Sequence, residues 1–272
     1  MSDEWSIPHS QPLDGAGIEA GRVARQDSSV LRPGGPWSSS VQSVLAALVD
    51  DGVTTVPAPL GIDSGGRERL AYLQGRDQGW PLLHAIQSLE GAYALGALVR
   101  ELQAALRRYR IPADARWQGR SEPAAPGEII QHGDLGPWNL LWSDGGESIV
   151  GVLDWELAEP EHPTYDLGFL AWHTVPAMDD ERASFRGFTG PPDRSARLAS
   201  FAAGAGVPAR DLAAAITRSQ LAFARKVDTR GRSSDGGRWR QLRDLGLEET
   251  ALSDYRWTKQ WLASDVDRHG PG

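Results

Sequence analysis

The chain has 272 residues, of which 40% are hydrophobic and 24% are charged, enough material for one large domain or two lobes with a buried core. Its formal net charge of −8 argues against general nucleic-acid binding, which depends on a cationic surface. The absence of cysteine excludes disulfides, thiolate catalysis and cysteine-ligated zinc. There is neither an apolar signal-peptide core near the start nor an apolar run long enough to span a membrane, so we expect a cytoplasmic protein with no membrane partner.

The N-terminal part of the chain, residues 1–75, is predicted to be a small sheet with one helix. Residues 1–12 have the composition of a loose polar leader. The segment from 13 to 33 then has a strand–turn–strand pattern, in which Gly15 and Gly17 would let the backbone approach a phosphate. A plain glycine-rich hairpin is the alternative interpretation of these glycines.

The next elements complete this small sheet. Apolar residues at helical spacing predict a short helix over 41–48. A hairpin follows around the glycines at 65 and 66, and its second strand is predicted over 70–73, ending at Gly75. We expect a hinge near Gly75 because the character of the chain changes there.

The remainder, residues 76–272, is predicted to be mainly helical. A short strand at 129–130 and a hairpin formed by 139–142 and 149–153 interrupt the helices. Helices are predicted over 95–109, 167–173, 194–203, 209–226 and 238–264, with a polar loop at 228–237. The arginine-rich region 194–243 would supply the polar faces of these helices, and a pocket for an anionic substrate is the alternative.

The stretch from 131 to 166 carries the most specific pattern in the chain. It contains the tripeptide His-Gly-Asp ending at Asp134, then Asn139, then Asp154 at the end of an apolar strand. The spacing D-x-x-x-x-N occurs in protein-kinase catalytic loops, where the Asp accepts the hydroxyl proton and the Asn holds magnesium. Asp154 stands where a second metal-binding carboxylate would belong. The pattern therefore favours phosphoryl transfer.

The same stretch lies in a region of one-sided charge. Residues 121–181 contain thirteen Asp or Glu and no Lys or Arg. Carboxylates beside an acceptor site would attract a cationic substrate. An ordinary solvated surface is the alternative interpretation, and the sequence does not separate the two.

These motifs together resemble the aminoglycoside phosphotransferase and choline kinase-like family. The resemblance is carried by His132-Gly133-Asp134 with Asn139, by Leu153-Asp154-Trp155-Glu156, and by Tyr165-Asp166-Leu167-Gly168. It is strong over 129–172 and weaker over 30–75. It implies an α+β, bilobal protein kinase-like fold, with a nucleotide-binding lobe at 1–75 and a catalytic and substrate-binding lobe at 76–272.

The family's activity implies a magnesium-dependent enzyme that transfers phosphate from ATP or GTP to an alcohol group of a small acceptor. The resemblance also implies a role in antibiotic resistance. By resemblance, Asp134 is the catalytic base and Asn139 and Asp154 are magnesium ligands. Asp166 would brace the catalytic loop through backbone N–H groups or through His132, which is expected to be a hydrogen-bonded loop residue.

Two further roles are expected around this core. Glu156 and Trp155 are candidates for substrate contact, although a tryptophan is more often a core residue. The nucleotide base is expected against the strand 70–73, so Leu73 is expected to contact the nucleotide. The glycines near residue 15 are expected to contact it as well.

The nucleotide lobe departs from the family pattern. The usual lysine of the third strand is missing, and Arg32 is the basic residue placed to take over its phosphate contacts, which a guanidinium can hold bidentately. The helix 41–48 carries Gln42 and no glutamate that could pair with such a cation. A catalytically weak or inactive binding protein of the same fold is therefore the main alternative function.

A third hypothesis is that the protein is a metal-dependent hydrolase that uses His132, Asp134 and Asp154. It would bind zinc or manganese without a nucleotide. The sequence does not identify the acceptor, the preferred nucleotide or the oligomeric state.

Overall fold

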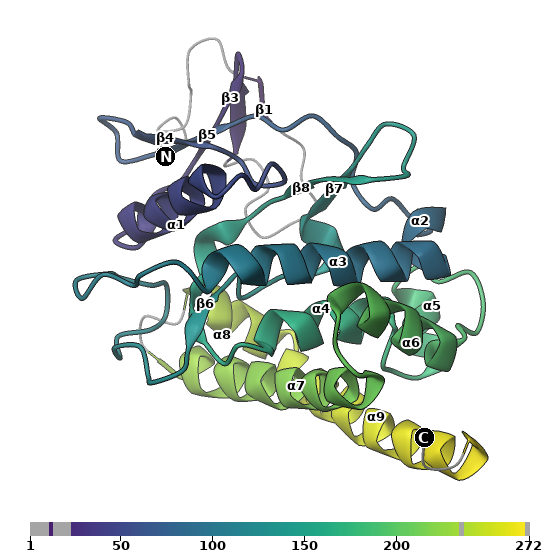
Figure 1. Ribbon diagram of the computed structural model, residues 1–272. Helices are drawn as coiled ribbons and strands as arrows, with labels where there is room; N and C mark the ends of the chain where they lie inside the picture. Colours follow the sequence, from purple (N-terminus) through teal and green to yellow (C-terminus); the bar gives the residue numbers. More distant parts are fainter. Residues whose placement is uncertain (1–10, 13–22, 234–236, 270–272) are drawn as a thin grey trace.

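The computed structural model describes residues 11–12, 23–233 and 237–269. Figure 1 shows a strand-rich N-terminal part above a mostly helical C-terminal part. This is the mixed α+β architecture that the sequence predicts. None of the helices in the described residues is long and apolar enough to cross a membrane.

The N-terminal part is a five-stranded antiparallel sheet with one helix against it. The strand order is β1-β2-β3-β5-β4, with α1 packed below the sheet in Figure 1. The helix buries the predicted apolar stripe of Val41, Val44, Leu45 and Leu48. The elements are β1 (Gln11–Pro12), β2 (Ala24–Gln26), β3 (Ser29–Arg32), α1 (Ser38–Asp50), β4 (Pro59–Ile62) and β5 (Glu68–Ala71).

Two boundaries in this sheet differ from the prediction. Gln11 and Pro12, expected at the end of a loose leader, form β1 and pair with β2. The hairpin after β4 is closed by Asp63, whose Oδ1 accepts from the backbone N–H groups of Gly65 and Arg67, each at 2.9 Å. This turn ends at Arg67, so β5 begins two residues before the predicted strand 70–73 and Leu73 lies beyond its end.

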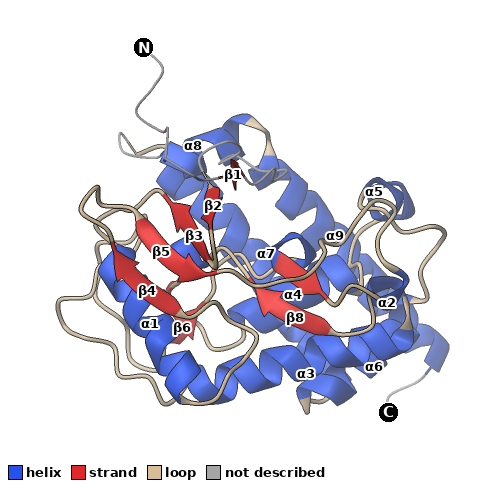
Figure 2. Cartoon of the chain, turned by 90° about the horizontal axis from the view of Figure 1, so that it is seen from above, coloured by secondary structure: helices blue, strands red, loops and turns tan. Residues whose placement is uncertain are grey.

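Two short strand pairs connect the sheet to the helical part, as the view from above in Figure 2 shows for β8. β6 (Ile129–Gln131) pairs with β9 (Glu159–Glu161), and β7 (Leu140–Trp142) pairs with β8 (Ile149–Val152), both antiparallel. The predicted hairpin at 139–153 is therefore confirmed. Two 3-10 turns flank it, η1 (Pro137–Asn139) and η2 (Trp155–Leu157).

Eight helices form most of the C-terminal part within the described residues. They are α2 (His84–Gln87), α3 (Leu89–Leu106), α4 (Tyr165–Thr174), α5 (Asp180–Phe185), α6 (Arg194–Ala205), α7 (Ala209–Gly231), α8 (Gly237–Asp244) and α9 (Leu247–His269). The main pairs are α3 with α6, α4 with α7, and α7 with α9, which lie in layers below the sheet (Figure 1).

The predicted helix boundaries near the C-terminus were wrong in two places. The helix α7 continues through the start of the predicted loop 228–237, where Asp228 accepts from Arg232 at 2.6 Å in an i, i+4 pair on the helix surface. The predicted single helix 238–264 is two helices, because Gly246 adopts φ +73° between them, a left-handed conformation that ends a helix.

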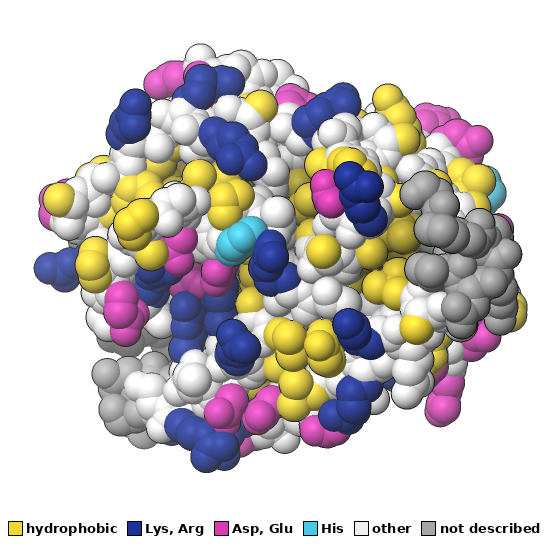
Figure 3. Space-filling model, turned by 60° about the horizontal axis from the view of Figure 1, so that its bottom comes forward, with side chains coloured by type: hydrophobic (Ala, Val, Ile, Leu, Met, Phe, Trp, Pro, Cys, Tyr) yellow, Lys and Arg dark blue, Asp and Glu magenta, His cyan; other side chains and the backbone are white. Residues whose placement is uncertain are grey.

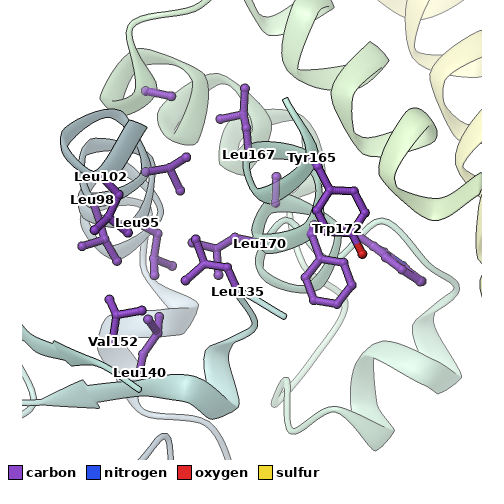
Figure 4. Packing of buried hydrophobic residues seen from close by; sticks show 14 of the residues in the cluster. Leu95, Leu98, Leu102, Leu135, Leu140, Val152, Tyr165, Leu167, Leu170 and Trp172 are labelled. Carbon is purple, nitrogen blue, oxygen red and sulfur yellow. The ribbon is translucent and has the colours of Figure 1, made fainter. Parts of the chain in front are cut away.

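The core joins α3, α4 and the β7–β8 hairpin (Figure 4). Three leucines of α3 face Leu140 and Val152 of the hairpin and Leu167 and Leu170 of α4, and these side chains are buried. Because both strands of the hairpin contribute to this core, the loops at its end are fixed relative to the helices. Those loops carry Asn139 and Asp154, two residues of the sequence motif.

Candidate active site

The β7–β8 hairpin brings two of the predicted site residues to one place. Asn139 immediately precedes β7 and Asp154 follows β8, and the strands run antiparallel with Leu140 opposite Val152. Both residues therefore lie at the same end of the hairpin, and the backbone N–H of Leu153 donates to the Asn139 carbonyl at 2.8 Å. Asp154 has φ +62°, a left-handed conformation that is unusual for a residue other than glycine and is typical of functional sites.

Asp134 joins this pair through a network on one carboxylate oxygen. Its Oδ2 accepts from Asn139 Nδ2 at 3.2 Å, from Trp138 Nε1 at 3.3 Å and from Arg238 Nη2 at 3.0 Å. Within the described part of the chain, no donor reaches its Oδ1. Burial raises the pKa of Asp134 to about 6, and the nearby Arg238 opposes this rise. The carboxyl group thus titrates near neutral pH and is mostly ionised at pH 7.

The loop that carries Asp134 is held from behind by Asp166. Its carboxylate accepts from the backbone N–H groups of His132 at 2.6 Å and Gly133 at 3.1 Å. Gly133 has φ +85°, and a Cβ there would lie 2.2 Å from the carbonyl oxygen of Leu157, so only glycine fits. Burial raises the pKa of Asp166 to about 7, against the opposing effect of its two backbone donors.

His132 uses both ring nitrogens inside this loop. Its Nε2 donates to the Leu153 carbonyl at 2.7 Å, and its Nδ1 accepts from the backbone N–H of Asp134 at 3.3 Å. Burial lowers the pKa of His132 to about 4, so the ring is neutral. Its ring centre lies 4.7 Å from that of Trp155. His132 therefore links the two loops and has no free nitrogen for a proton shuttle.

Arg32, at the end of β3, faces these loops from the sheet. Its guanidinium contacts Asp154 Oδ1 at 2.9 Å and Glu156 Oε2 at 2.5 Å, and its Nε lies 3.7 Å from Glu68 Oε2. Burial lowers the pKa of Arg32, but the three carboxylates outweigh it and hold that pKa above its usual value. The same cation keeps the pKa of Asp154 below its usual value despite burial.

The partner of Arg32 within the sheet is Glu68, which the sequence analysis missed. The predicted absence of a glutamate in the helix is correct, since Gln42 of α1 instead donates to the Arg69 carbonyl and accepts from the Gly61 N–H. Glu68 is only 1% exposed and lies directly opposite Arg32 in the β3–β5 register. Glu68 fits the alternating pattern of this strand. The strand was predicted to begin only at residue 70, so Glu68 was left in the preceding turn.

A second arginine enters the site from α8. Arg238 Nη1 contacts Glu156 Oε1 at 2.6 Å and lies 3.5 Å from Asp154 Oδ2, and its Nη2 contacts Asp134. Its neighbour Trp239 is buried and fixes α8 against α7. From the sequence, Arg238 was expected on a polar helix face. No local pattern marks it, because its contacts are 82 and 104 residues away in sequence.

The two predicted substrate contacts, Glu156 and Trp155, both make their contacts within the protein. Glu156 is buried, and its two carboxylate oxygens bind the two arginines, Arg32 and Arg238. Trp155 is 2% exposed and donates from Nε1 to the Val152 carbonyl at 2.9 Å. Trp155 is therefore a core residue under the loop and does not line an open pocket.

Leu73 is the one predicted nucleotide contact besides Arg32 that falls within the described residues. Leu73 is partly buried, and a Cβ at Gly151 of β8 would lie 3.1 Å from its Cδ1, so Leu73 lies beside the hairpin. Gly15 and Gly17 lie outside the described residues.

Six of the thirteen acidic residues of this window form ion pairs with cations of the C-terminal helices, namely Asp134, Asp154, Glu156, Glu159, Glu161 and Asp180. Glu159 contacts Lys226 Nζ at 2.7 Å and Arg230 at 2.8 Å, and Glu161 contacts Lys226 at 2.8 Å. Asp180 contacts Arg194 at 2.8 Å. On the face shown in Figure 3, basic side chains lie among acidic and hydrophobic ones instead of forming one patch. The part of the window nearest the motif residues is therefore paired within the protein, whereas Glu122, Asp144, Glu147 and Glu181 are exposed.

Comparison with known proteins identifies the motif segment. Residues 106–199 match the model of the Phosphotransferase enzyme family. The trifolitoxin immunity protein of Rhizobium leguminosarum bv. trifolii is 32% identical over 167 residues, covering 59% of this chain and 61% of that protein. The match thus spans about three fifths of that relative. The predicted family resemblance is confirmed over the segment 106–199.

The chain is also similar to solved structures of phosphotransferases. The gentamicin complex of APH(2")-IIa has a TM-score of 0.50 and 9% identity, with 86% of each chain covered. The macrolide 2'-phosphotransferase MphH from Brachybacterium faecium has a TM-score of 0.49 and 19% identity, covering 90% of this chain and 91% of that one. At such identities the similarity to APH(2")-IIa shows the fold alone, which is the protein kinase-like phosphotransferase fold that the sequence predicted.

Proposed function

We propose that this chain, whose residues 106–199 carry the phosphotransferase family segment, transfers the γ-phosphate of ATP or GTP to a hydroxyl group of a small molecule. The observation that supports this most is the convergence of Asp134, Asn139 and Asp154 at one end of the β7–β8 hairpin, facing Arg32. Phosphoryl transfer requires a carboxylate beside the attacking hydroxyl, and cations and oxygen ligands around the phosphates.

Asp134 is the proposed base. Its Oδ2 is held by donors from three residues, which leaves Oδ1 for the proton of the acceptor hydroxyl. A base works best when its pKa lies near the working pH, and the pKa of Asp134 is raised to about 6. Asp166 and His132 are the proposed supports of the loop, through the hydrogen bonds described above.

Asp154 and Asn139 are the proposed magnesium ligands. The donor set fits the ion, because magnesium takes one or two carboxylates together with phosphate and water oxygens. The Asp154 side chain is 30% exposed, and the Asn139 amide nitrogen is turned to Asp134, which leaves its oxygen for a metal. When bound, the ion would neutralise charge on the transferred phosphate. In this structure Arg32 contacts one Asp154 oxygen and Arg238 lies near the other. With magnesium bound to Asp154, each arginine would be free to turn to phosphate oxygens.

The nucleotide is proposed to lie between the sheet and the hairpin. Arg32 would hold phosphate oxygens, with Glu68 keeping its side chain in place. Leu73, Gly15 and Gly17 remain proposed nucleotide contacts. We propose the lobe boundary at Gly75, where the following residue, Arg76, exchanges two backbone hydrogen bonds with Trp142 at 2.8 Å each.

One observation favours a non-catalytic binding protein as the second candidate. Arg238 pairs directly with the proposed base, and both arginines occupy the carboxylates of the proposed metal site. A protein that only binds its ligand could keep this closed network. The name of the immunity protein relative favours a role in resistance to an antibiotic or toxin under either candidate.

A screen of ATP and GTP with a panel of hydroxyl-bearing acceptors tests the proposal. We expect acceptor-dependent release of ADP or GDP that is lost in EDTA. The Asp154→Ala variant should bind the magnesium–nucleotide complex at least about tenfold more weakly in calorimetry, because it loses a metal ligand. Unchanged affinity in that variant would remove Asp154 from the metal site, and nucleotide binding without any transfer would favour the second candidate.

A further inference from the structure

A pocket of about 260 Å³ lies beside Asp134 and shares one side chain with it. The ring of Trp138 lines the pocket, while its Nε1 donates to Asp134 Oδ2 at 3.3 Å. The opposite walls come from the segment before α2, from α4 and from the end of α5. A group seated here is therefore separated from the Asp134 carboxylate by one indole ring.

The pocket is aromatic and mostly uncharged. Trp80 and Phe185 stand at its edge, 66% and 78% exposed, with ring centres 6.5 Å apart in an edge-to-face arrangement. His173 forms part of the inner wall, 4.7 Å from Trp138 between ring centres. Burial keeps the pKa of His173 well below its usual value, so this ring is neutral. Exposed aromatic side chains around a cavity of this size suit a ring-sized apolar group.

The one charged residue among the described residues that line the pocket is Arg186. Its guanidinium lies 5.4 Å from the centre of the Trp138 ring. No carboxylate of the described chain forms an ion pair with it, whereas Arg182, one turn earlier, contacts Asp254 at 2.8 Å. Burial and the nearby Arg182 lower the pKa of Arg186, and the carboxylates of Asp254 and Asp134 act in the opposite direction. A partly buried cation without an anion is costly, and a ligand anion would remove that cost.

We propose that this pocket receives the phosphate acceptor, and that the acceptor is a hydroxy compound bearing a ring-sized aromatic or apolar group and a carboxylate. Its ring would lie between Trp80, Phe185 and Trp138, and its carboxylate would pair with Arg186. This inference rests on the proposed function for the role of Asp134. It differs from the expected cationic acceptor, and it is favoured because Glu156, Glu159 and Glu161, three of the carboxylates that motivated that expectation, are paired within the protein.

Three matched compounds test the charge preference without any nucleotide. They share a benzylic alcohol and differ at the other end: 3-hydroxy-3-phenylpropanoate, its amide, and 3-amino-1-phenylpropan-1-ol. Calorimetry on the whole protein should show the carboxylate binding about tenfold more tightly than the amide, the effect of one charge-assisted contact, and the ammonium compound binding most weakly.

Two variants and a control assign this preference to the pocket. Arg186→Gln should bind the carboxylate and the amide within about twofold of each other. Phe185→Ala, at a highly exposed position, should weaken the binding of all three compounds by the same factor. Arg210→Gln, whose side chain is 84% exposed on α7, should retain the wild-type order. Circular dichroism checks that each variant is folded.

Equal affinities for the three compounds, tighter binding of the ammonium compound, or no binding of the carboxylate up to about 10 mM would overturn the inference. So would an unchanged preference in Arg186→Gln. These outcomes do not depend on phosphate transfer. Failure of the proposed function would instead appear as binding of the carboxylate with no release of ADP or GDP when magnesium and nucleotide are added.

Discussion

Asp134 combines a raised pKa with one occupied and one available carboxylate oxygen. Burial is the larger influence on that pKa, and the positive charge of Arg238 acts in the opposite direction. A base must be ionised to accept a proton, so its pKa sets the lower end of the pH range in which the enzyme works. With Asp134 as the proposed base, the acid side of a pH profile is expected to report on its ionisation.

We expect kcat/KM to fall on the acid side with an apparent pKa near 6, by about tenfold per pH unit below it. Arg238→Gln removes the positive charge that stabilises the ionised carboxylate, so this limb should move to higher pH. Arg240→Gln, an exposed arginine on the same helix, should leave the limb in place. A limb that stays put in Arg238→Gln would mean that another group is titrating.

At this scale the sequence predicted the residues that lie within one short motif region. Asp134 lies five residues before Asn139, and the β7–β8 hairpin turns the chain back so that Asp154 meets Asn139. Glu68 and Arg238 escaped prediction for different physical reasons. Glu68 depends on where a turn ends and a strand begins, and Arg238 depends on how α8 packs, which no local spacing encodes.

At the scale of elements, the pair α3 and α6 depends on glycines where the two helices touch. A Cβ at Gly96 would lie 2.1 Å from the carbonyl oxygen of Phe201, and one at Gly204 would lie 2.0 Å from that of Tyr93. The two backbones are therefore in contact, with glycine on each side. Since α3 also forms one wall of the core beneath the β7–β8 hairpin, this contact supports the site from a distance.

Gly96→Ala should lower the free energy of unfolding by about 1–2 kcal/mol, because overpacking outweighs the higher helix propensity of alanine. Glu101→Ala, at an exposed position in the same helix, should change it by less than about 0.5 kcal/mol. Urea denaturation of both variants checks this. Stabilisation by Gly96→Ala would show that the helices can separate without cost.

Helix and strand identity followed from apolar periodicity, but several boundaries did not. The apolar stripe of α3 and the hairpin turn at 143–146 were correctly read from spacing. The division between α8 and α9 rests on the backbone of Gly246, and an isolated glycine within a helical pattern does not by itself indicate a break. Tertiary contacts decide such cases.

At the scale of the whole molecule, Glu156 joins parts of the protein that are distant in sequence. One oxygen binds Arg32 of the N-terminal sheet and the other binds Arg238 of the C-terminal helices, at 2.5 Å and 2.6 Å. Both arginines are the cations best placed to meet a nucleotide phosphate. Under the proposed function, the ion pairs with Glu156 would compete with nucleotide binding while they hold the two parts together.

Glu156→Gln should have opposite effects on affinity and stability. We expect Mg–nucleotide to bind about five- to tenfold more tightly in calorimetry, since both arginines lose a competing anion, and the free energy of unfolding to fall by about 1–3 kcal/mol. Glu161→Gln, which removes a carboxylate paired with Lys226, should leave nucleotide affinity unchanged. Weaker nucleotide binding in Glu156→Gln would instead make Glu156 part of the nucleotide site.

The central claim is that Asp134 activates the acceptor hydroxyl for phosphoryl transfer, and single-turnover kinetics of Asp134→Asn test it most directly. With an acceptor from the screen, the rate of phosphate transfer should fall by about 10²–10⁴-fold, because the base is lost while its size is kept. Nucleotide affinity should remain within about threefold of wild type. A transfer rate within tenfold of wild type would contradict the assignment of Asp134 as the base.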